Sequence, residues 1–196
     1  MSLWDRPNGP NSQAATVANS IPLNTQAALP GPLPAGLTLT GTSETVVPST
    51  ENAAVPLTVV LPPNTQNEQT ALDLVATGIV TTKNSTNITI NVYEGVSLTV
   101  GSDKLLGSSG AVAVNSKTVA WKAKLELLYD SVSGVLVGTI EFYLAEAIVA
   151  KVTLSNFPTG ISNTGNPVAT FLLSFTSSAA DGSHATTVNV QKFSVG

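Results

Sequence analysis

Alternating apolar and polar positions in the second half of the chain give its clearest structural signal. In KTVAWKAKLELLYD, residues 117–130, every second residue from Val119 to Tyr129 is apolar, and lysines and a glutamate stand between them. A period of two is typical of a β-strand with one buried face. We therefore expect Trp121, which is in the apolar phase, to lie in a core, and a sugar-stacking groove is the alternative for this residue.

The next segment repeats the pattern and predicts a hairpin. Residues 135–144, VLVGTIEFYL, place Leu136, Ile140 and Leu144 on one side. The link DSVSG before them is short and rich in turn-forming residues. The two strands are therefore expected to pair antiparallel.

Short apolar runs separated by Gly, Asn, Ser and Pro continue through the rest of the chain. Further strands are expected at residues 36–40, 55–61, 73–82, 87–93, 96–100, 111–114, 147–154, 169–175 and 186–195. No segment has a sustained helical period, and residues 65–74 are expected to form a single helical turn at most. Proline is absent between Pro63 and Pro158, which fits central strands that use every backbone donor.

The number and length of these strands predict an all-β fold, an antiparallel β-sandwich of two sheets packed face to face. Eight or more strands favour a jelly-roll-like topology over a seven-stranded immunoglobulin type. The expected domain spans residues 36–196. Leu172 and Val137 break the polar alternation, so the second face of some strands is expected to be partly covered.

A proline-rich segment precedes the domain, with half of the twelve prolines before residue 36. Because proline lacks a backbone donor, residues 1–35 are expected to form an extended arm, with a solvated tail as the alternative. The arm is more apolar than a solvated tail usually is. The residues expected to bind a partner are Leu3, Trp4, Ile21, Leu23, Leu29 and Leu33.

Composition narrows the classes of function. Charged residues make up 10% of the chain, against about 25% in typical soluble proteins. An uncharged polar surface repels neighbouring copies weakly and favours assembly. The net charge of −4, with Arg6 as the single arginine, argues against a nucleic-acid binder. No membrane span and no signal peptide are recognised, so we expect a protein made in a cytoplasm and kept there or released by lysis.

No catalytic constellation is apparent, and we expect no enzyme. The single histidine, His184, shares one tight loop with Asp181 and Ser183, which leaves no separately positioned nucleophile and acid. Glu141 and Glu146 are the residues that a glycosidase interpretation would pair. Glu141 is in the polar phase of its strand and is expected to be a solvated acid, and Glu146 is expected in a turn.

Metal and sugar sites are weakly indicated. The carboxylates compatible with calcium sites in loops are Asp73, Glu94, Asp103 and Asp130, but no Asp-x-Asp-x-Asp-Gly spacing occurs, and cysteine is absent. We therefore expect neither a metal nor a cofactor. Asn84 and Asn87 begin glycosylation acceptor patterns, which arise by chance in a chain rich in Asn, Ser and Thr.

The last eighty residues combine several recurring features. AWKAKLELLYDSVSGVLVGTIEFYL, residues 120–144, has a Trp followed by small and aliphatic residues, a hairpin with Gly and a strand ending in an aromatic. PVATFLLSFTSSAADGSHATTVNVQKFSV, residues 167–195, has an Ala/Ser/Asp loop and a Thr-rich strand. This pattern resembles a jelly-roll module of virion proteins from tailed bacteriophages, and MSLWDRPNG is similar to the starts of small phage structural proteins. Phe175 departs from the pattern, which has a tryptophan there.

The resemblance implies a non-enzymatic structural protein of the virion. A capsid decoration or cement protein is expected, which would bind the major capsid protein or other virion proteins and form a homo-oligomer, with a trimer favoured. A carbohydrate-binding or host-adsorption module of a tail or fibre is the alternative. That alternative requires exposed aromatic side chains, for which Tyr93, Tyr143 and Phe157 are the candidates.

Overall fold

The described part of the chain consists of β-strands joined by turns. The computed structural model describes residues 37–39, 45–46, 57–60, 69–82, 86–95, 102–115, 118–161, 168–178 and 186–195. The strands are β1 Leu37–Leu39, β2 Thr45–Val46, β3 Leu57–Val60, β4 Gln69–Thr81, β5 Asn87–Glu94, β6 Lys104–Ser108, β7 Val112–Ala113, β8 Thr118–Asp130, β9 Val135–Leu144, β10 Ala147–Pro158, β11 Val168–Ser177 and β12 Thr186–Val195. These residues contain no helix that is long and apolar enough to cross a membrane.

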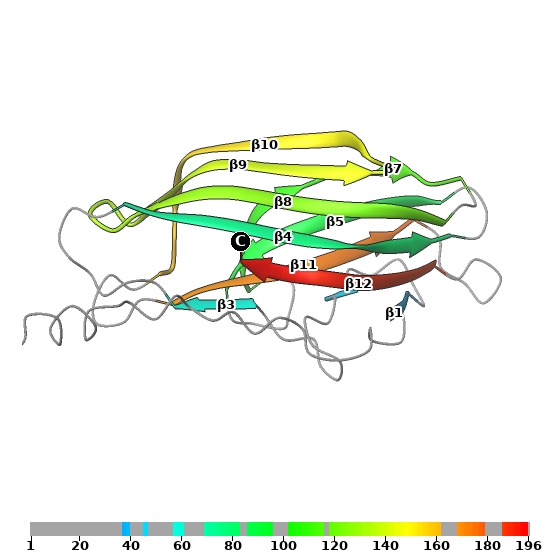
Figure 1. Ribbon diagram of the computed structural model, residues 1–196, viewed down its shortest axis with the longest axis horizontal. Helices are drawn as coiled ribbons and strands as arrows, with labels where there is room; N and C mark the ends of the chain where they lie inside the picture. The colour runs from blue at the N-terminus through cyan, green and yellow to red at the C-terminus, as the bar shows by residue number, and fades with distance from the viewer. Residues whose placement is uncertain are drawn as a thin grey trace, which may run out of the picture.

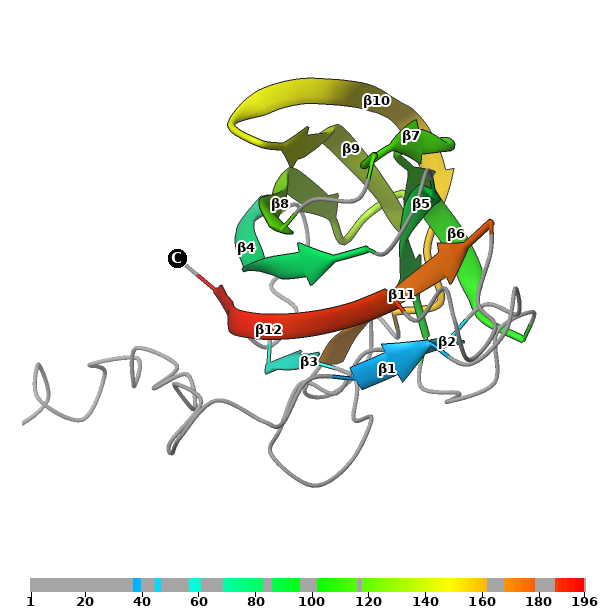
Figure 2. The same cartoon turned by 90° about the vertical axis from the view of Figure 1, so that its right-hand side faces the viewer.

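Two antiparallel sheets face each other. Sheet A has the order β1-β12-β4-β8-β9-β10, and sheet B has the order β2-β11-β5-β6, with β3 also paired to β11 and β7 to β5. Figure 1 shows the long strands of sheet A, and Figure 2 shows the two layers along the strands. The prediction of an all-β antiparallel sandwich is confirmed.

The connections between the sheets explain the jelly-roll-like character of the fold. β4 pairs with β12 in sheet A, while β5 pairs with β11 in sheet B, both antiparallel. Since β4 continues into β5 and β11 continues into β12, a two-stranded ribbon folds over both sheets, as in a jelly roll. The meander β8-β9-β10 then extends sheet A on one side only.

The core lies between the sheets and is built from the apolar phase of each long strand. On β8 the residues from Trp121 to Tyr129 alternate between buried and more exposed positions, as the sequence predicted. The Trp121 ring packs edge-on against Phe175 of β11, with ring centroids 5.0 Å apart. Trp121 is 2% exposed, so it is a core residue and does not line a groove.

The predicted hairpin joins β8 and β9. Asp130 pairs with Val135 across it, and the Gly134 amide donates to the Asp130 carbonyl at 2.9 Å. The Asp130 carboxylate accepts bonds from the Val132 amide at 2.9 Å and the Ser133 hydroxyl at 2.6 Å. These bonds lower the pKa of Asp130, the Ser133 hydroxyl contributing most. Its carboxylate therefore stabilises the turn.

Several strand predictions need correction. β4 begins at Gln69, so the helical turn proposed within residues 65–74 is wrong from Gln69 onward, because this stretch pairs with β8. β2 and β6 were not predicted, and β10 extends four residues beyond its predicted end at Leu154. Residues 96–100 lie outside the described residues. Leu172 is buried, as expected for a strand covered on both faces, whereas Val137 is exposed.

Candidate functional site

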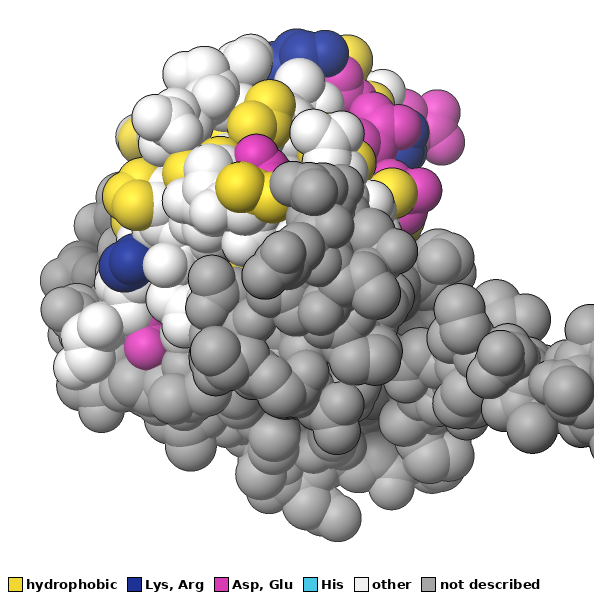
Figure 3. Space-filling view, turned by 90° about the vertical axis from the view of Figure 1, so that its left-hand side faces the viewer, with side chains coloured by type: hydrophobic (Ala, Val, Ile, Leu, Met, Phe, Trp, Pro, Cys, Tyr) yellow, Lys and Arg dark blue, Asp and Glu magenta, His cyan; other side chains and the backbone are white. Residues whose placement is uncertain are grey.

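One face of sheet A gathers charged side chains. β4, β8, β9 and β10 contribute alternate residues to the side of the sheet that faces away from sheet B. We call this the charged face, and its residues are Asp73, Lys122, Lys124, Glu126, Glu141, Tyr143 and Lys151. Figure 3 shows Asp, Glu and Lys side chains grouped at the upper right of the end-on view.

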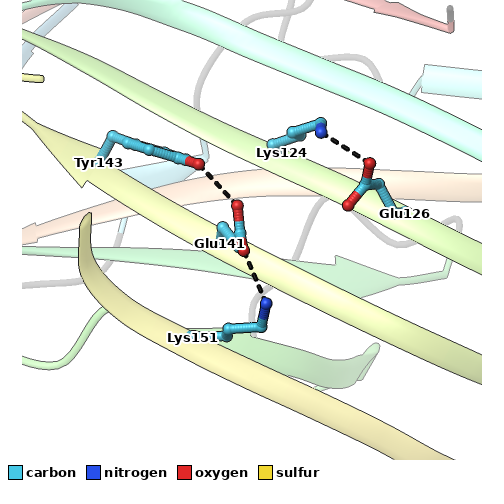
Figure 4. Close-up of polar contacts among 5 residues, drawn as sticks. All are labelled: Lys124, Glu126, Glu141, Tyr143 and Lys151. Atoms are coloured by element: carbon cyan, nitrogen blue, oxygen red, sulfur yellow. Dashed lines mark hydrogen bonds and ion pairs between the residues drawn. The ribbon is translucent and has the colours of Figure 1, made fainter. Parts of the chain in front are cut away.

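The side chains of the charged face bind one another (Figure 4). The Lys151 ammonium donates to one oxygen of Glu141 at 2.8 Å, and the Tyr143 hydroxyl donates to the other at 2.6 Å. The Lys124 ammonium pairs with Glu126 at 2.6 Å. The three lysines balance the three carboxylates, so this face is nearly neutral.

These contacts determine the ionisation of Glu141. The hydrogen bond from Lys151 lowers the pKa of Glu141, and the bond from Tyr143 adds to this effect. The same bond raises the pKa of Tyr143, because it favours the protonated phenol beside a carboxylate. Glu141 is in the polar phase on the outer face, as predicted, and its side chain is 14% exposed because two partners hold it.

Glu141 and Glu146 do not form the pair of carboxylates that a glycosidase uses. Glu141 is engaged by Lys151 and Tyr143, which keep it ionised. Glu146 lies in the exposed turn between β9 and β10, as predicted, with a φ of 67°. A general acid needs a raised pKa, whereas the surroundings of Glu141 lower its pKa.

A second polar group lies at the end of the sandwich near the β8–β9 turn. We call it the acidic end, and it comprises Glu94, Asp103, Tyr129, Asp130 and Thr159. Glu94 ends β5 in the same phase as the core residues Ile88, Ile90 and Val92, so its side chain enters the sandwich. One carboxylate oxygen of Glu94 accepts bonds from the Thr159 hydroxyl at 2.7 Å and the Gly160 amide at 2.8 Å.

At the acidic end, Oε2 of Glu94 and the hydroxyl oxygen of Tyr129 are buried and have no hydrogen-bond partner among the described residues. Glu94 is 5% exposed and Tyr129 is 2% exposed. Burial raises the pKa of Tyr129, and the charges of Asp130 and Glu94 raise it further. Buried polar atoms normally have hydrogen-bond partners, so these two oxygens are exceptions that need an explanation.

Glu94 was predicted to be a loop acid, but it ends β5 and is buried. The signal was present, because Glu94 continues the period-two series that begins at Ile88. An acid in the apolar phase of a strand predicts a buried carboxylate.

The other predicted site residues have different outcomes. Tyr93 is buried in β5, and Phe157 packs against the core from β10, so neither is an exposed loop aromatic. Among the described residues, no three carboxylate or imidazole groups are arranged to hold a metal. The predictions that lie outside the described residues concern Leu3, Trp4, Ile21, Leu23, Leu29, Leu33, Asn84, Asp181, Ser183 and His184.

Comparison with known proteins identifies no relative of this chain. No protein-family model, curated protein or solved structure matches the chain. The fold and the two polar groups define an antiparallel β-sandwich with a charged outer face and a buried carboxylate at one end.

Proposed function

We propose that the protein is a non-enzymatic structural component of a bacteriophage particle, a capsid decoration or cement protein that stabilises the head through protein–protein contacts. The resemblance of residues 117–196 to virion jelly-roll modules supports this function. The low charge of the whole chain and the apolar residues of its N-terminal segment agree with a protein that is packed against neighbours.

The separation of charge on the sandwich carries the proposal. Of the lysines whose side chains are described, Lys122, Lys124 and Lys151 lie on the charged face, and Lys104 lies elsewhere. Lysine and acidic residues are depleted in protein–protein interfaces. In an assembled particle, the charged face would therefore point to solvent, and less charged surfaces would meet the partner.

The binding mechanism combines a rigid body with an arm. The sandwich would sit on a symmetry axis, as a trimer, while residues 1–35 lie across a neighbouring capsid subunit. Apolar side chains of the arm would contribute about 25 cal/mol per Å² buried, before the cost of ordering the chain.

Deletion of residues 2–35 tests this function. The truncated protein is expected to retain its β-sheet circular dichroism spectrum and to lose co-sedimentation with phage heads. A matched control exchanges Lys124 and Glu126 for serine on the charged face and is expected to co-sediment like the wild type. Undiminished binding by the truncated protein, or loss of binding in the control, would contradict the proposal.

The carbohydrate-binding module remains the second candidate because of Tyr143. This aromatic side chain lies on the outer face of sheet A beside the polar groups of Glu141 and Lys151. The ammonium of Lys122 stands 4.0 Å from the centre of its ring, however, and must move before a sugar can stack on that side. Glycan binding that is lost in Tyr143→Ala would favour this function over the structural one.

A further inference from the structure

Apolar side chains adjoin one another on the outer side of sheet A, at the end where β8 turns into β9. Ala71 of β4, Leu128 of β8 and Val137 of β9 stand directly opposite one another across the three strands. Val137 is 37% exposed. Val135 continues the group toward the turn, where Val132 is 62% exposed. We call these five residues the valine patch, and Figure 3 faces the end of the sandwich at which they lie.

The valine patch is open to a partner. Sheet B packs against the opposite side of sheet A, so the strands of the described part of the chain leave the patch uncovered. Single apolar side chains are common on protein surfaces, but adjoining ones on three neighbouring strands are typical of an interaction site.

An unbalanced carboxylate borders the valine patch. Asp73 follows Ala71 by two residues on β4 and stands directly opposite Glu126 of β8. Like charges in directly opposite positions repel each other. Lys124 pairs with Glu126 at 2.6 Å, whereas Asp73 has no ion pair among the described residues. A cation supplied by a partner would therefore be favourable beside Asp73.

The spacing of the patch and the carboxylate indicates what kind of segment fits. In an extended segment, side chains two residues apart lie on the same side and are separated by about 6.6 Å. Ala71 and Asp73 have this separation along β4, because they too are two strand residues apart. A segment that lies along β4 with an apolar residue on the patch therefore brings its second next residue to Asp73.

The N-terminal segment of the chain has a suitable pair. Trp4 precedes Arg6 by two residues, and Arg6 is the only arginine. Pro7 favours an extended conformation of the residue before it. Tryptophan and arginine are enriched among the residues that dominate binding energy, and arginine binds a carboxylate through two parallel hydrogen bonds. Asp5 would alternate to the opposite side of an extended segment, away from Asp73.

The length of this segment allows Trp4 to reach another molecule. β1 begins at Leu37, which pairs with Val188 near the start of β12, whereas the end of β12 lies nearer the valine patch. The chain between Trp4 and Leu37 would span about 100 Å in an extended polyproline conformation. That is several times the diameter of a small domain, which is about 30 Å.

We propose that Trp4 and Arg6 of one copy dock on a neighbouring copy, with Trp4 on the valine patch and Arg6 at Asp73. This exchange rests on the proposed function, because the arm that crosses a capsid subunit then ends on the next copy. Lys124 and Glu126 keep the pair that they already form, so their replacement by serine does not disturb the contact.

Disulfide trapping tests the contact in the full chain, which has no cysteine of its own. Ser2 is two residues before Trp4, and Gln69 is two residues before Ala71 on β4, so the two should meet. Chains with Ser2→Cys are mixed with chains carrying Gln69→Cys under a mild oxidant. A dimer is expected several-fold faster than in the control mixture with Ile148→Cys, a position that is 56% exposed at the start of β10.

Further substitutions in the mixed chains identify the contacts. Trp4→Ala and Arg6→Asp are each expected to slow the disulfide several-fold. Asp73→Arg added to Arg6→Asp is expected to restore the rate, because the charges are exchanged between the same two positions. Circular dichroism of each variant establishes that it is folded.

Three results would overturn the proposal. They are equal rates with Gln69→Cys and Ile148→Cys, a fast reaction that Trp4→Ala does not slow, and a bond that forms within a doubly substituted chain but never between mixed chains. The mixtures are measured in solution and on phage heads. Head binding without the specific disulfide would refute the exchange alone, whereas the disulfide in solution without head binding would contradict the capsid function and leave the contact standing.

Discussion

Glu141 on the charged face and Glu94 at the acidic end are both strand carboxylates, but they are compensated in different ways. Glu141 faces outward, where Tyr143 of its own strand β9 and Lys151 of the adjacent strand β10 bind its two oxygens. Glu94 faces the core, where neutral donors bind one oxygen only. Burial without a paired cation therefore distinguishes Glu94 from Glu141, because a buried carboxylate costs free energy unless it is paired or fully hydrogen-bonded.

The largest expected difference between the two regions concerns packing. Gly95 has a φ of 149°, and a Cβ added there would collide with the carboxylate of Asp103. Gly95→Ala is therefore expected to destabilise the fold by about 3 kcal/mol, through backbone strain and displacement of Asp103. Urea unfolding measures this change.

Gly110→Ala is the control for that substitution. Gly110 also has a positive φ, of 64°, but nothing lies within 4 Å of its Cβ position. About 1 kcal/mol is expected from the backbone conformation alone. Equal losses for the two variants would show that the acidic end is not tightly packed around Asp103.

The next largest effect is expected from removal of the two side chains themselves. Glu94→Ala leaves the Thr159 hydroxyl and the Gly160 amide without their acceptor and opens a cavity, and should cost about 2 kcal/mol. Glu141→Ala affects side chains that water can solvate, and a clearly smaller loss is expected. Urea unfolding compares the two variants, and a greater loss of stability for Glu141→Ala would reverse the contrast.

The sequence predicted the sandwich because β4, β8 and most of β9 alternate between apolar and polar residues. The phases of β8 and β9, their hairpin and the burial of Trp121 follow from period-two patterns within each segment. The pairing of β4 with β12 could not be predicted from the sequence, because contacts between distant segments leave no local pattern. β6 was missed because its KLLGS sequence is short and contains a glycine, which strands disfavour.

The polar sites show the same limit. A register between strands decides that Lys151 meets Glu141 and that Asp73 stands opposite Glu126. Neither pairing is visible in one strand alone. The phase of Glu94, by contrast, is a local property of β5. The sequence of this strand alone is therefore enough to predict that the carboxylate is buried.

Tyrosine titration separates the two regions by the cause of each shift. The pKa of Tyr143 is raised mainly by its bond to Glu141, and that of Tyr129 mainly by burial. Glu141→Gln is therefore expected to return the pKa of Tyr143 toward its ordinary value of about 10 and to leave Tyr129 unchanged. Ultraviolet absorbance during alkaline titration, with Tyr129→Phe and Tyr143→Phe for assignment, gives both values.

The stability of the fold follows from the same shifts. A tyrosine whose pKa is raised on folding stabilises the protein below its unfolded value of about 10, and this contribution is lost as pH rises through the folded value. Tyr129→Phe is expected to resist alkaline unfolding better than the wild type, because it cannot form a buried phenolate. An identical alkaline midpoint for both proteins would show that the pKa of Tyr129 is the same in the folded and the unfolded protein.

The smallest expected effect is the response of the charged face to acid. Lys151 and Tyr143 lower the pKa of Glu141, so its contribution to stability is present above its unfolded value of about 4.3 and is lost as pH falls through the lower folded value. The difference in melting temperature between wild type and Glu141→Gln should therefore shrink in acid. It should also shrink in 1 M sodium chloride, which screens the exposed Lys151. A difference that is insensitive to both pH and salt would mean that Glu141 stabilises the sheet through packing alone. The ion pairs of the charged face would then contribute nothing to the stability of the fold.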